Sequence, residues 1–397
     1  PARTKDRMKT LANPCRRRLA ALCLAMCTLP AAFAAQAQTA APPALELVVL
    51  GSGGPGATGR AGSAFVVLVD GVARVFVDAG PGSFVRLGEA KLALGRADIV
   101  LLTHLHVDHA GGLPGLFKAR AVSNRGPVDF KIFGPAGRRA LDADDADFPA
   151  TSRFIDLLFG KQGAFGYLKD FSAPLRFQVT DIDAPATAAA LPEVRTLFDE
   201  GGLRISAVAG HHRDAPAVVY RIDHAGKSIT FSGDIDASGL AGLRRIAQGT
   251  SLLVFNSVVL DPPGSPDVLY TLHTPPKAIG EVADAVRAGQ LLLSHLSPAL
   301  DAQRDAVKAS IAAHYAGGVV FAQDGQRLAP CGAQPPAIVP VPAPSSTPVP
   351  TDPTKVITRA MPSGHRNTAA SNFMRWPTDG LPLTKPSVPT PRSRPRK

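Results

Sequence analysis

The chain has 397 residues, enough for one large domain or two small ones, and a formal net charge of +11 at pH 7. Most of this charge lies at the ends: residues 1–35 carry a net charge of +6 and residues 331–397 one of +7, which leaves −2 for residues 36–330. A mildly acidic core is not a surface that tracks nucleic-acid phosphates, so the charge distribution predicts no nucleic-acid partner.

The N-terminal segment has the pattern of a secretory signal peptide. Met8 is the predicted start, and the three arginines Arg16–Arg18 precede an apolar stretch that ends in small residues typical of a cleavage site. The stretch is short for a membrane span and Pro30 interrupts it, so no membrane anchor is predicted. Residues 1–37 therefore predict export to the periplasm or out of the cell.

The C-terminal segment, residues 331–397, is basic and rich in proline, with few residues that form a core. Such a composition predicts a disordered tail. Three of the four cysteines lie in the signal segment and the fourth is Cys331, so neither an internal disulfide nor a cysteine-based zinc site is predicted. The predicted organisation is a signal peptide (1–37), one folded domain (38–330) and a tail.

Apolar, β-branched runs between glycine- and proline-rich turns predict the strands of the domain. Strands are predicted at residues 45–50, 64–69, 73–77, 99–102, 203–209, 217–222, 228–231, 252–255 and 291–293, and helices at 236–248, 276–288 and 301–315. Asp70-Gly71 predicts a hairpin turn between the second and third strands. Because the opening strands are linked by hairpins, this order favours two mixed sheets with helices outside over an alternating parallel array.

Residues 148–177 contain seven of the 23 aromatic side chains. An apolar cluster of this size marks interfaces and grooves alike. Two interpretations therefore stay open: an insertion that packs on the core or on a second subunit of a homodimer, and a lid over the active site.

The segment Thr103–His109 directly follows a predicted strand and contains three histidines and an aspartate. His104 and His106 are two residues apart in an extended segment, so their side chains point to the same side. Asp108 and His109 follow at a turn, from which they can reach a second ion. Imidazole and carboxylate together favour zinc or a similar first-row metal.

Other potential metal ligands follow other predicted strands. The pair His211-His212, then Asp234, and then His295 each come directly after an apolar strand. Surface histidines have no reason to repeat this placement, so the pattern indicates a metal site that closes at the strand ends.

These motifs resemble the metallo-β-lactamase superfamily, and more closely its ribonuclease Z and arylsulfatase-like branch. The resemblance covers about residues 44–330 and is carried by Leu50–Gly56, Thr103–Gly115, Phe231–Asp234 and Leu293–Pro298. It implies an α/β fold, a four-layer αββα sandwich with the metals at the sheet edges.

The resemblance also implies a set of ligands for two divalent metal ions, zinc first, with manganese(II) or iron(II) as alternatives. One ion takes His104, His106 and a histidine of the 211–212 pair, with His212 preferred, and the other takes Asp108, His109 and His295, with Asp234 as the bridge. Ribonuclease Z enzymes have a histidine that helps to protonate the leaving group, and His273 matches its position; the alternative role is a cap for the next helix. Asp78 is either a carboxylate that fixes a ligating imidazole or a turn cap.

Two positions depart from the family pattern. Ile235 stands where threonine often follows the bridging aspartate, and Asn256 stands where an acidic residue is common. Neither residue is expected to contact the ligands. A long glycine- and proline-rich arm for transfer RNA is not evident in the sequence.

The predicted function is hydrolysis of a small-molecule ester, either a phosphodiester or a sulfate ester, by a hydroxide that bridges the two metals. Asp108 would orient this nucleophile, and His273 would protonate the departing oxygen. A lactone or β-lactam hydrolase on the same site is the alternative. A non-catalytic metal-binding module is a third interpretation, against which the complete ligand set argues.

Overall fold

The computed structural model describes residues 41–56, 59–124, 126–139, 147–170, 174–183, 193–213 and 215–330. The predicted signal peptide (1–37) and the predicted tail (331–397) lie outside the described residues. Among the described helices, none combines the length and the apolar character that crossing a bilayer demands.

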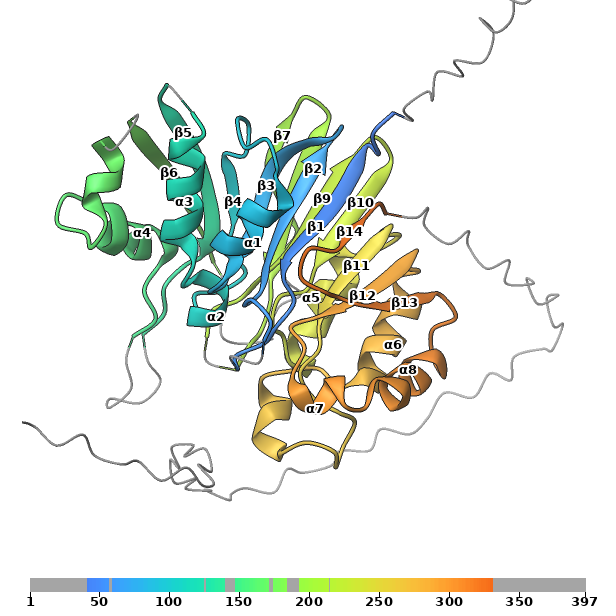
Figure 1. The fold of residues 1–397 in the computed structure, drawn as a ribbon. Helices are drawn as coiled ribbons and strands as arrows, with labels where there is room; N and C mark the ends of the chain where they lie inside the picture. The colour runs from blue at the N-terminus through green and yellow to red at the C-terminus, as the bar shows by residue number, and fades with distance from the viewer. Residues whose placement is uncertain are drawn as a thin grey trace, which may run out of the picture. The chain divides into compact units, whose positions relative to one another are not determined.

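Within the described residues, seven strands form a first sheet in the order β14-β1-β2-β3-β4-β5-β6 (Figure 1). They are β1 (Leu45–Gly51), β2 (Ala64–Val69), β3 (Val72–Ala79), β4 (Ile99–Leu101), β5 (Val128–Pro135), β6 (Leu175–Ile182) and β14 (Arg327–Leu328). The strands from β14 to β3 pair antiparallel, and those from β3 to β6 pair parallel.

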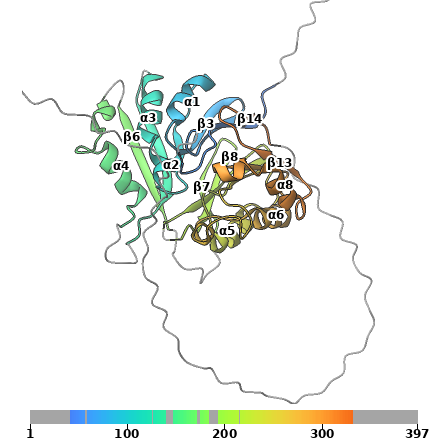
Figure 2. The ribbon, with the colours of Figure 1, turned by 60° about the horizontal axis from the view of Figure 1, so that its bottom comes forward.

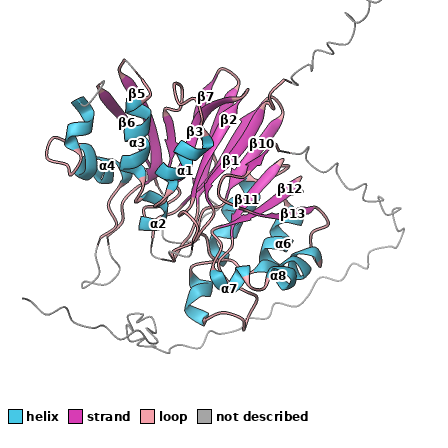
Figure 3. Ribbon diagram, in the orientation of Figure 1, coloured by secondary structure: helices cyan, strands magenta, loops and turns pink. Residues whose placement is uncertain are grey.

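The second sheet, counted over the same described ranges, also has seven strands, in the order β13-β12-β11-β10-β9-β8-β7 (Figure 3). They are β7 (Arg195–Glu200), β8 (Leu203–Ala209), β9 (Val218–His224), β10 (Lys227–Phe231), β11 (Leu252–Asn256), β12 (Gln290–Ser294) and β13 (Gly318–Phe321). The strands from β7 to β10 pair antiparallel, and those from β10 to β13 pair parallel.

Helices cover the outer faces of both sheets (Figure 2). On the first sheet and its loops lie α1 (Ser83–Ala90), α2 (Val107–Ala110), α3 (Leu113–Val122), α4 (Thr151–Phe159) and η2 (Gly166–Asp170). On the second sheet and its loops lie η3 (Ala237–Gly239), α5 (Leu240–Ile246), η4 (Asp267–Thr271), α6 (Pro276–Ala285), α7 (Pro298–Asp301) and α8 (Arg304–Ala312).

The strand β2 shows why its sequence is apolar at every position. Phe65, Val67 and Val69 pack between the two sheets, whereas the alternate residues, such as Val66 and Leu68, pack under the helices. A strand buried on both faces has a continuous apolar run because neither set of side chains meets water. The predicted four-layer αββα sandwich is confirmed.

The described part of the aromatic segment packs on the core of the first sheet, as one of its two interpretations expects. Ile155, Phe159 and Leu168 are buried with the helices of the first sheet, and the rings of Phe117 and Phe177 stack with centroids 5.2 Å apart. This burial accounts for the apolar residues of α4, because Ile155 and Phe159 fill the space beside the edge strand β6.

Candidate metal centre

The predicted ligands follow strands of both sheets. Thr103–His109 follows β4 of the first sheet, whereas Asp234 and His295 follow β10 and β12 of the second. A buried hydrogen bond joins the sheets beside the motif, because the Tyr220 hydroxyl of β9 donates to the Leu102 carbonyl over 3.0 Å. The two sheets therefore present their strand ends to one site.

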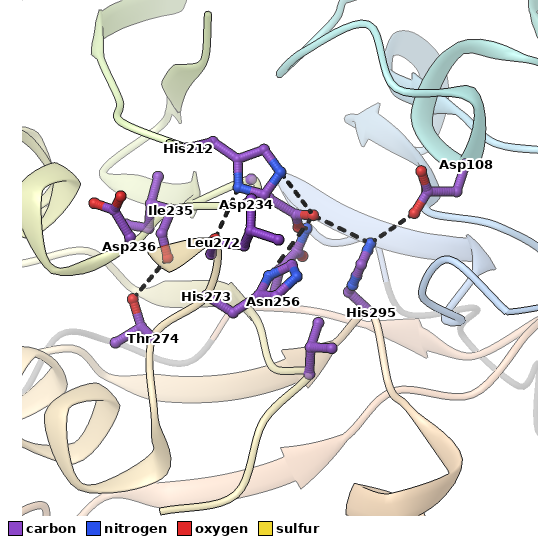
Figure 4. A network of polar contacts seen from close by, with 12 residues as sticks. Asp108, His212, Asp234, Ile235, Asp236, Asn256, Leu272, His273, Thr274 and His295 are labelled. Atoms are coloured by element: carbon purple, nitrogen blue, oxygen red, sulfur yellow. Dashed lines mark hydrogen bonds and ion pairs between the residues drawn. The ribbon is translucent and has the colours of Figure 1, made fainter. Parts of the chain in front are cut away.

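Asp234 lies at the centre of this site (Figure 4). Its Oδ2 atom lies 3.4–3.9 Å from an imidazole nitrogen of each of His104, His109, His212, His273 and His295. The carboxylate is only 3% exposed, and a buried charge is costly unless it is paired or coordinates a metal. Gly233, at φ +57°, precedes it and lets the chain pass Thr103, whose Cβ would lie 2.8 Å from any added Cβ.

The other predicted ligands form two groups of three. One group contains His104, His106 and His212, and the other contains Asp108, His109 and His295. Within each group the potential ligand atoms lie within 4.8 Å of one another, and Asp234 forms further groups of this kind with members of both. Three donors for each ion and one shared carboxylate match the four ligands that zinc commonly takes. The structure thus brings all seven predicted ligands together.

Two buried nitrogens test whether these residues fit metal ions. Within the described residues, neither the Nε2 atom of His104 nor that of His109 has a hydrogen-bond partner, although both side chains are fully buried. Buried polar atoms are almost always hydrogen bonded, and an orphaned one calls for an ion or a water. The donor set and these two nitrogens therefore fit divalent cations.

Hydrogen bonds around the cluster fix which nitrogen of each ring faces inward. The Nδ1 atom of His212 lies 2.8 Å from the Leu272 carbonyl. A carbonyl only accepts, so Nδ1 carries the proton and the Nε2 lone pair is free for a cation. His109 has the same arrangement with Asp78, whose Oδ2 lies 2.8 Å from Nδ1. Asp78 thus contacts an imidazole of the cluster, as one of its two predicted roles requires.

Burial and charge set the protonation states of the site. Burial, reinforced by the imidazole of His109, holds the pKa of His104 well below its usual value, so its ring is neutral. Burial alone would raise the pKa of Asp234, but the neighbouring imidazoles, His295 first, outweigh it and hold that pKa well below its usual range. His104 and Asp234 are thus in the forms that bind metal. His109, whose pKa is raised by Asp234 and Asp78, would instead release a proton on binding a cation.

The two histidines of the 211–212 pair point to different places. His212 is 2% exposed and joins the cluster, whereas His211 is 24% exposed and its Nδ1 lies 2.7 Å from Asp236. Position along the chain supported only a preference between the two, and the structure places His212, and not His211, among the potential ligands.

His273 also lies in the cluster, with its Nδ1 3.8 Å from Asp234 Oδ2 and without a hydrogen-bond partner in the described part of the chain. Burial is the main cause that lowers the pKa of His273, to about 3. The helix after it is capped by Pro275 without any side-chain hydrogen bond, so the geometry gives no support to the helix-cap alternative.

The expectation that the two departures from the family pattern avoid the ligands is wrong for Asn256. Its Nδ2 atom donates a hydrogen bond of 2.8 Å to Oδ1 of Asp234. Asn256 is the last residue of β11, and β11 pairs with β10 on one side and β12 on the other. Asp234 follows β10 and His295 follows β12, so a polar residue at the end of the strand between them could have been predicted to contact the site. The backbone carbonyl of Ile235 accepts a hydrogen bond from the Thr274 hydroxyl.

The site opens on the side of α2. The side chains of His104, His109 and His295 are fully buried, whereas that of Asp108 is 13% exposed. Val107, beside Asp108, is 72% exposed. Asp108, at the start of α2, is therefore a member of the cluster that solvent can reach.

Comparisons with known proteins agree with this geometry. The model of the beta-lactamase superfamily domain matches residues 73–296, more than half of the chain. Ribonuclease Z of Mycobacterium avium is 29% identical over 296 residues, which cover 72% of this chain and 98% of that protein. Among solved structures, the metallo-β-lactamase fold protein YhfI from Bacillus subtilis matches with a TM-score of 0.52 at 19% identity, covering 72% of this chain and 99% of that one. The short form of human tRNase Z matches with a TM-score of 0.51 at 23% identity, covering 71% and 98%. At these identities, the two structures show the fold alone.

The prediction that no nucleic acid is a partner is wrong. The curated relatives are ribonucleases, and the match spans nearly the whole length of the Mycobacterium avium protein. The prediction failed because it relied on a net charge summed over residues 36–330. Such a sum does not describe the electrostatic potential at the strand ends that carry the ligands, because cations bound there would be the largest local charges.

The predicted enzyme class agrees with the family model, the relatives and the clustered donors. The chain belongs to the metallo-β-lactamase superfamily, in the branch that includes ribonuclease Z, and is a metal-dependent hydrolase.

Proposed function

We propose that the protein hydrolyses phosphodiesters at a site for two divalent cations. The observation that carries the proposal is the position of Asp234 Oδ2, which faces imidazoles of both donor groups. One oxygen shared between two groups of donors suits a pair of ions about 3.5–4 Å apart, a common arrangement in phosphate-ester hydrolases. The ribonuclease relatives favour a phosphodiester over a sulfate ester, because RNA is joined by phosphodiester bonds.

Each donor group would hold one ion. The group of His104, His106 and His212 would hold the first, the group of Asp108, His109 and His295 the second, and Asp234 would serve both. Zinc is the proposed ion, because imidazole and carboxylate donors suit it, with manganese(II) or iron(II) as alternatives.

When bound, the two cations supply an activated water and polarise a phosphoryl oxygen. Asp108 lies on the open side of the cluster, where its carboxylate can accept a hydrogen bond from the attacking water and orient it toward phosphorus. The water would lose a proton to solvent as its oxygen forms a bond to phosphorus, and the bond from phosphorus to the leaving oxygen would break. That oxygen then needs a proton.

His273 is the proposed source of this proton. With the pKa of His273 at about 3, the ring is neutral at pH 7 in the substrate-free protein. The negative charge of a phosphodiester opposes this effect, because an anion near an imidazole stabilises its protonated form. From this position, His273 would donate the proton that the leaving oxygen requires.

Export to the periplasm or out of the cell is also part of the proposal. It rests on the basic, apolar and small-residue pattern of residues 1–37. A fusion of these residues to an alkaline phosphatase that is active only after export would test it, and an inactive fusion protein would contradict it.

The substrate class is tested with the full chain loaded with zinc or manganese. The substrates are bis-p-nitrophenyl phosphate, a single-stranded RNA, an aryl sulfate, a lactone and a β-lactam. Turnover of the first two, abolished by a chelator and restored by the metal, is the expected result. Faster turnover of the sulfate, lactone or β-lactam would contradict the phosphodiesterase assignment.

A further inference from the structure

We propose that Asn256 is a positioning residue that holds one oxygen of Asp234, so that the other oxygen alone is presented to both cations. This inference rests on the proposed two-cation site, and it concerns how the orientation of the Asp234 carboxylate is fixed.

The two oxygens of Asp234 have separate environments (Figure 4). Oδ1 accepts a hydrogen bond of 2.8 Å from the Asn256 amide. Oδ2 faces the imidazole nitrogens of both donor groups, the nearest being that of His295 at 3.4 Å. Because a carboxylate can rotate about its Cβ–Cγ bond, a donor that engages Oδ1 decides which oxygen faces the donor groups.

Asn256 is itself held in place. It is the last residue of β11, its backbone N–H donates to the Ser232 hydroxyl over 3.1 Å, and it pairs in register with Ser294 of β12. Asn256 is 5% exposed, so water has little access to compete for its amide. A donor fixed on a central strand loses little additional conformational freedom when it holds the carboxylate.

The chemistry of the amide explains why asparagine suits this position. The Nδ2 atom carries two protons, and only this end of the amide can face a carboxylate oxygen without repulsion. An acidic side chain here would place a second negative charge against Asp234 or would need a proton of its own. The neutral amide stabilises the carboxylate and leaves the charge of the site to Asp108 and Asp234.

A shared carboxylate gives the inference a specific signature. If Asn256 acts through Asp234, its loss weakens both metal-binding steps, because both ions use the same oxygen. A residue that supports a ligand of one group weakens only one step. The full chain is therefore titrated with zinc in competition with a chromophoric chelator, and both stepwise affinities are measured.

Asn256→Leu removes the donor at similar volume, and Asn256→Ala is a second variant in case the first does not fold. Each is expected to weaken both zinc-binding steps, by roughly 10- to 100-fold, the usual effect of losing a group that orients a ligand. Ser257→Ala is the matched control: Ser257 is the next residue, is fully buried, and its hydroxyl makes no hydrogen bond within the described residues. His106→Ala is the comparison for loss of a single step.

The melting temperature is measured for each variant without metal and with zinc. A merely structural role lowers the metal-free value, whereas the positioning role lowers the gain that zinc produces, since bound metal stabilises in proportion to its affinity. Parent-like affinities in both Asn256 variants, or a loss confined to one step, would overturn the inference. If the parent itself binds fewer than two ions, the proposed function fails first and the inference fails with it.

Discussion

The carboxylate of Asp78 and the imidazole of His109 form a buried pair, with Oδ2 and Nδ1 2.8 Å apart and the side chains 2% and 0% exposed. Asp78 also accepts two hydrogen bonds from Thr103, one from its N–H and one from its hydroxyl. Burial lowers the pKa of His109, but the carboxylates of Asp234 and Asp78 outweigh it and raise that pKa well above its usual value. Asp78 therefore fixes both the first residue of the motif and one of its rings.

We expect Asp78→Ala to weaken zinc binding at one of the two steps by roughly 10- to 100-fold, because His109 loses the group that orients it. The stepwise affinities check this. Asp70→Ala is the matched control, since Asp70 also pairs with a histidine, His224, but is 67% exposed there. Equal affinities in the Asp78 variant and the control would contradict the assigned role.

The full chain is expected to hold two metal ions and to lose activity to a chelator. Asp234→Ala should lose more metal than His211→Ala, because Asp234 faces both donor groups whereas His211 pairs with Asp236 outside them. Metal analysis of protein prepared without chelators, and supplied with zinc, measures both. One ion or none in the parent protein would contradict the prediction.

The sequence predicted this site better than it predicted the sheets around it. The strands that lead to ligands were identifiable because they are buried on both faces and consist of apolar runs, as in Ile99–Leu101. Five strands were not predicted: the interior strand β5 and the four edge strands β6, β7, β13 and β14. Among the edge strands, β6 alternates between partly buried and exposed residues, and β14 has only two residues. Edge strands have a weaker pattern because one side lacks a partner strand.

The contacts behind the ligands were less accessible to sequence reasoning. Histidine and aspartate are common metal ligands, so the spacing of His104 and the position of Asp234 directly after a strand were enough to identify both. Asn256 could not be identified in this way, because asparagine is common in the turns that follow strands and so does not indicate a metal site. Its role depends on β11 pairing between β10 and β12, and the pairing order of parallel strands is decided by the whole fold.

His273→Ala is expected to keep both metals and to slow hydrolysis by roughly 100- to 10,000-fold, the usual contribution of a general acid. The loss should be smaller for a p-nitrophenyl ester, whose leaving group needs little protonation, and larger for an alkyl phosphodiester. Turnover of both substrates and the metal content are measured together. An unchanged rate on the alkyl ester would remove His273 from the mechanism, and a loss of metal would make it a ligand.

The metal-free protein is expected to lose stability as the pH falls from about 7.5 to 5.5. Burial lowers the pKa of four imidazoles, those of His104, His106, His212 and His273. Their ordinary pKa is about 6.5, so in this range the unfolded chain takes up protons that the folded chain does not, and acid favours unfolding. The pKa of His109 is raised, so its protonation stabilises the folded chain as the pH falls. This single ring opposes the destabilising effect of the other four imidazoles.

Urea unfolding midpoints of the metal-free chain at the two pH values measure this effect. His273→Ala removes one of the four imidazoles and should reduce the difference between the midpoints. A midpoint that rises on acidification, or a difference that the variant leaves unchanged, would contradict this account of the site.

The donors come from distant parts of the chain, and this has a consequence for when metal is acquired. The first donor group is incomplete until the segment at His212 has folded, and the second until β12 has paired and delivered His295. A chain synthesised only as far as β10 therefore lacks His295 and cannot complete the second donor group. Because a preformed site does not exist in the unfolded chain, the free energy of binding each ion also stabilises the folded state. Complete occupancy by two ions thus requires that residues following β4 of the first sheet and β8, β10 and β12 of the second have come together.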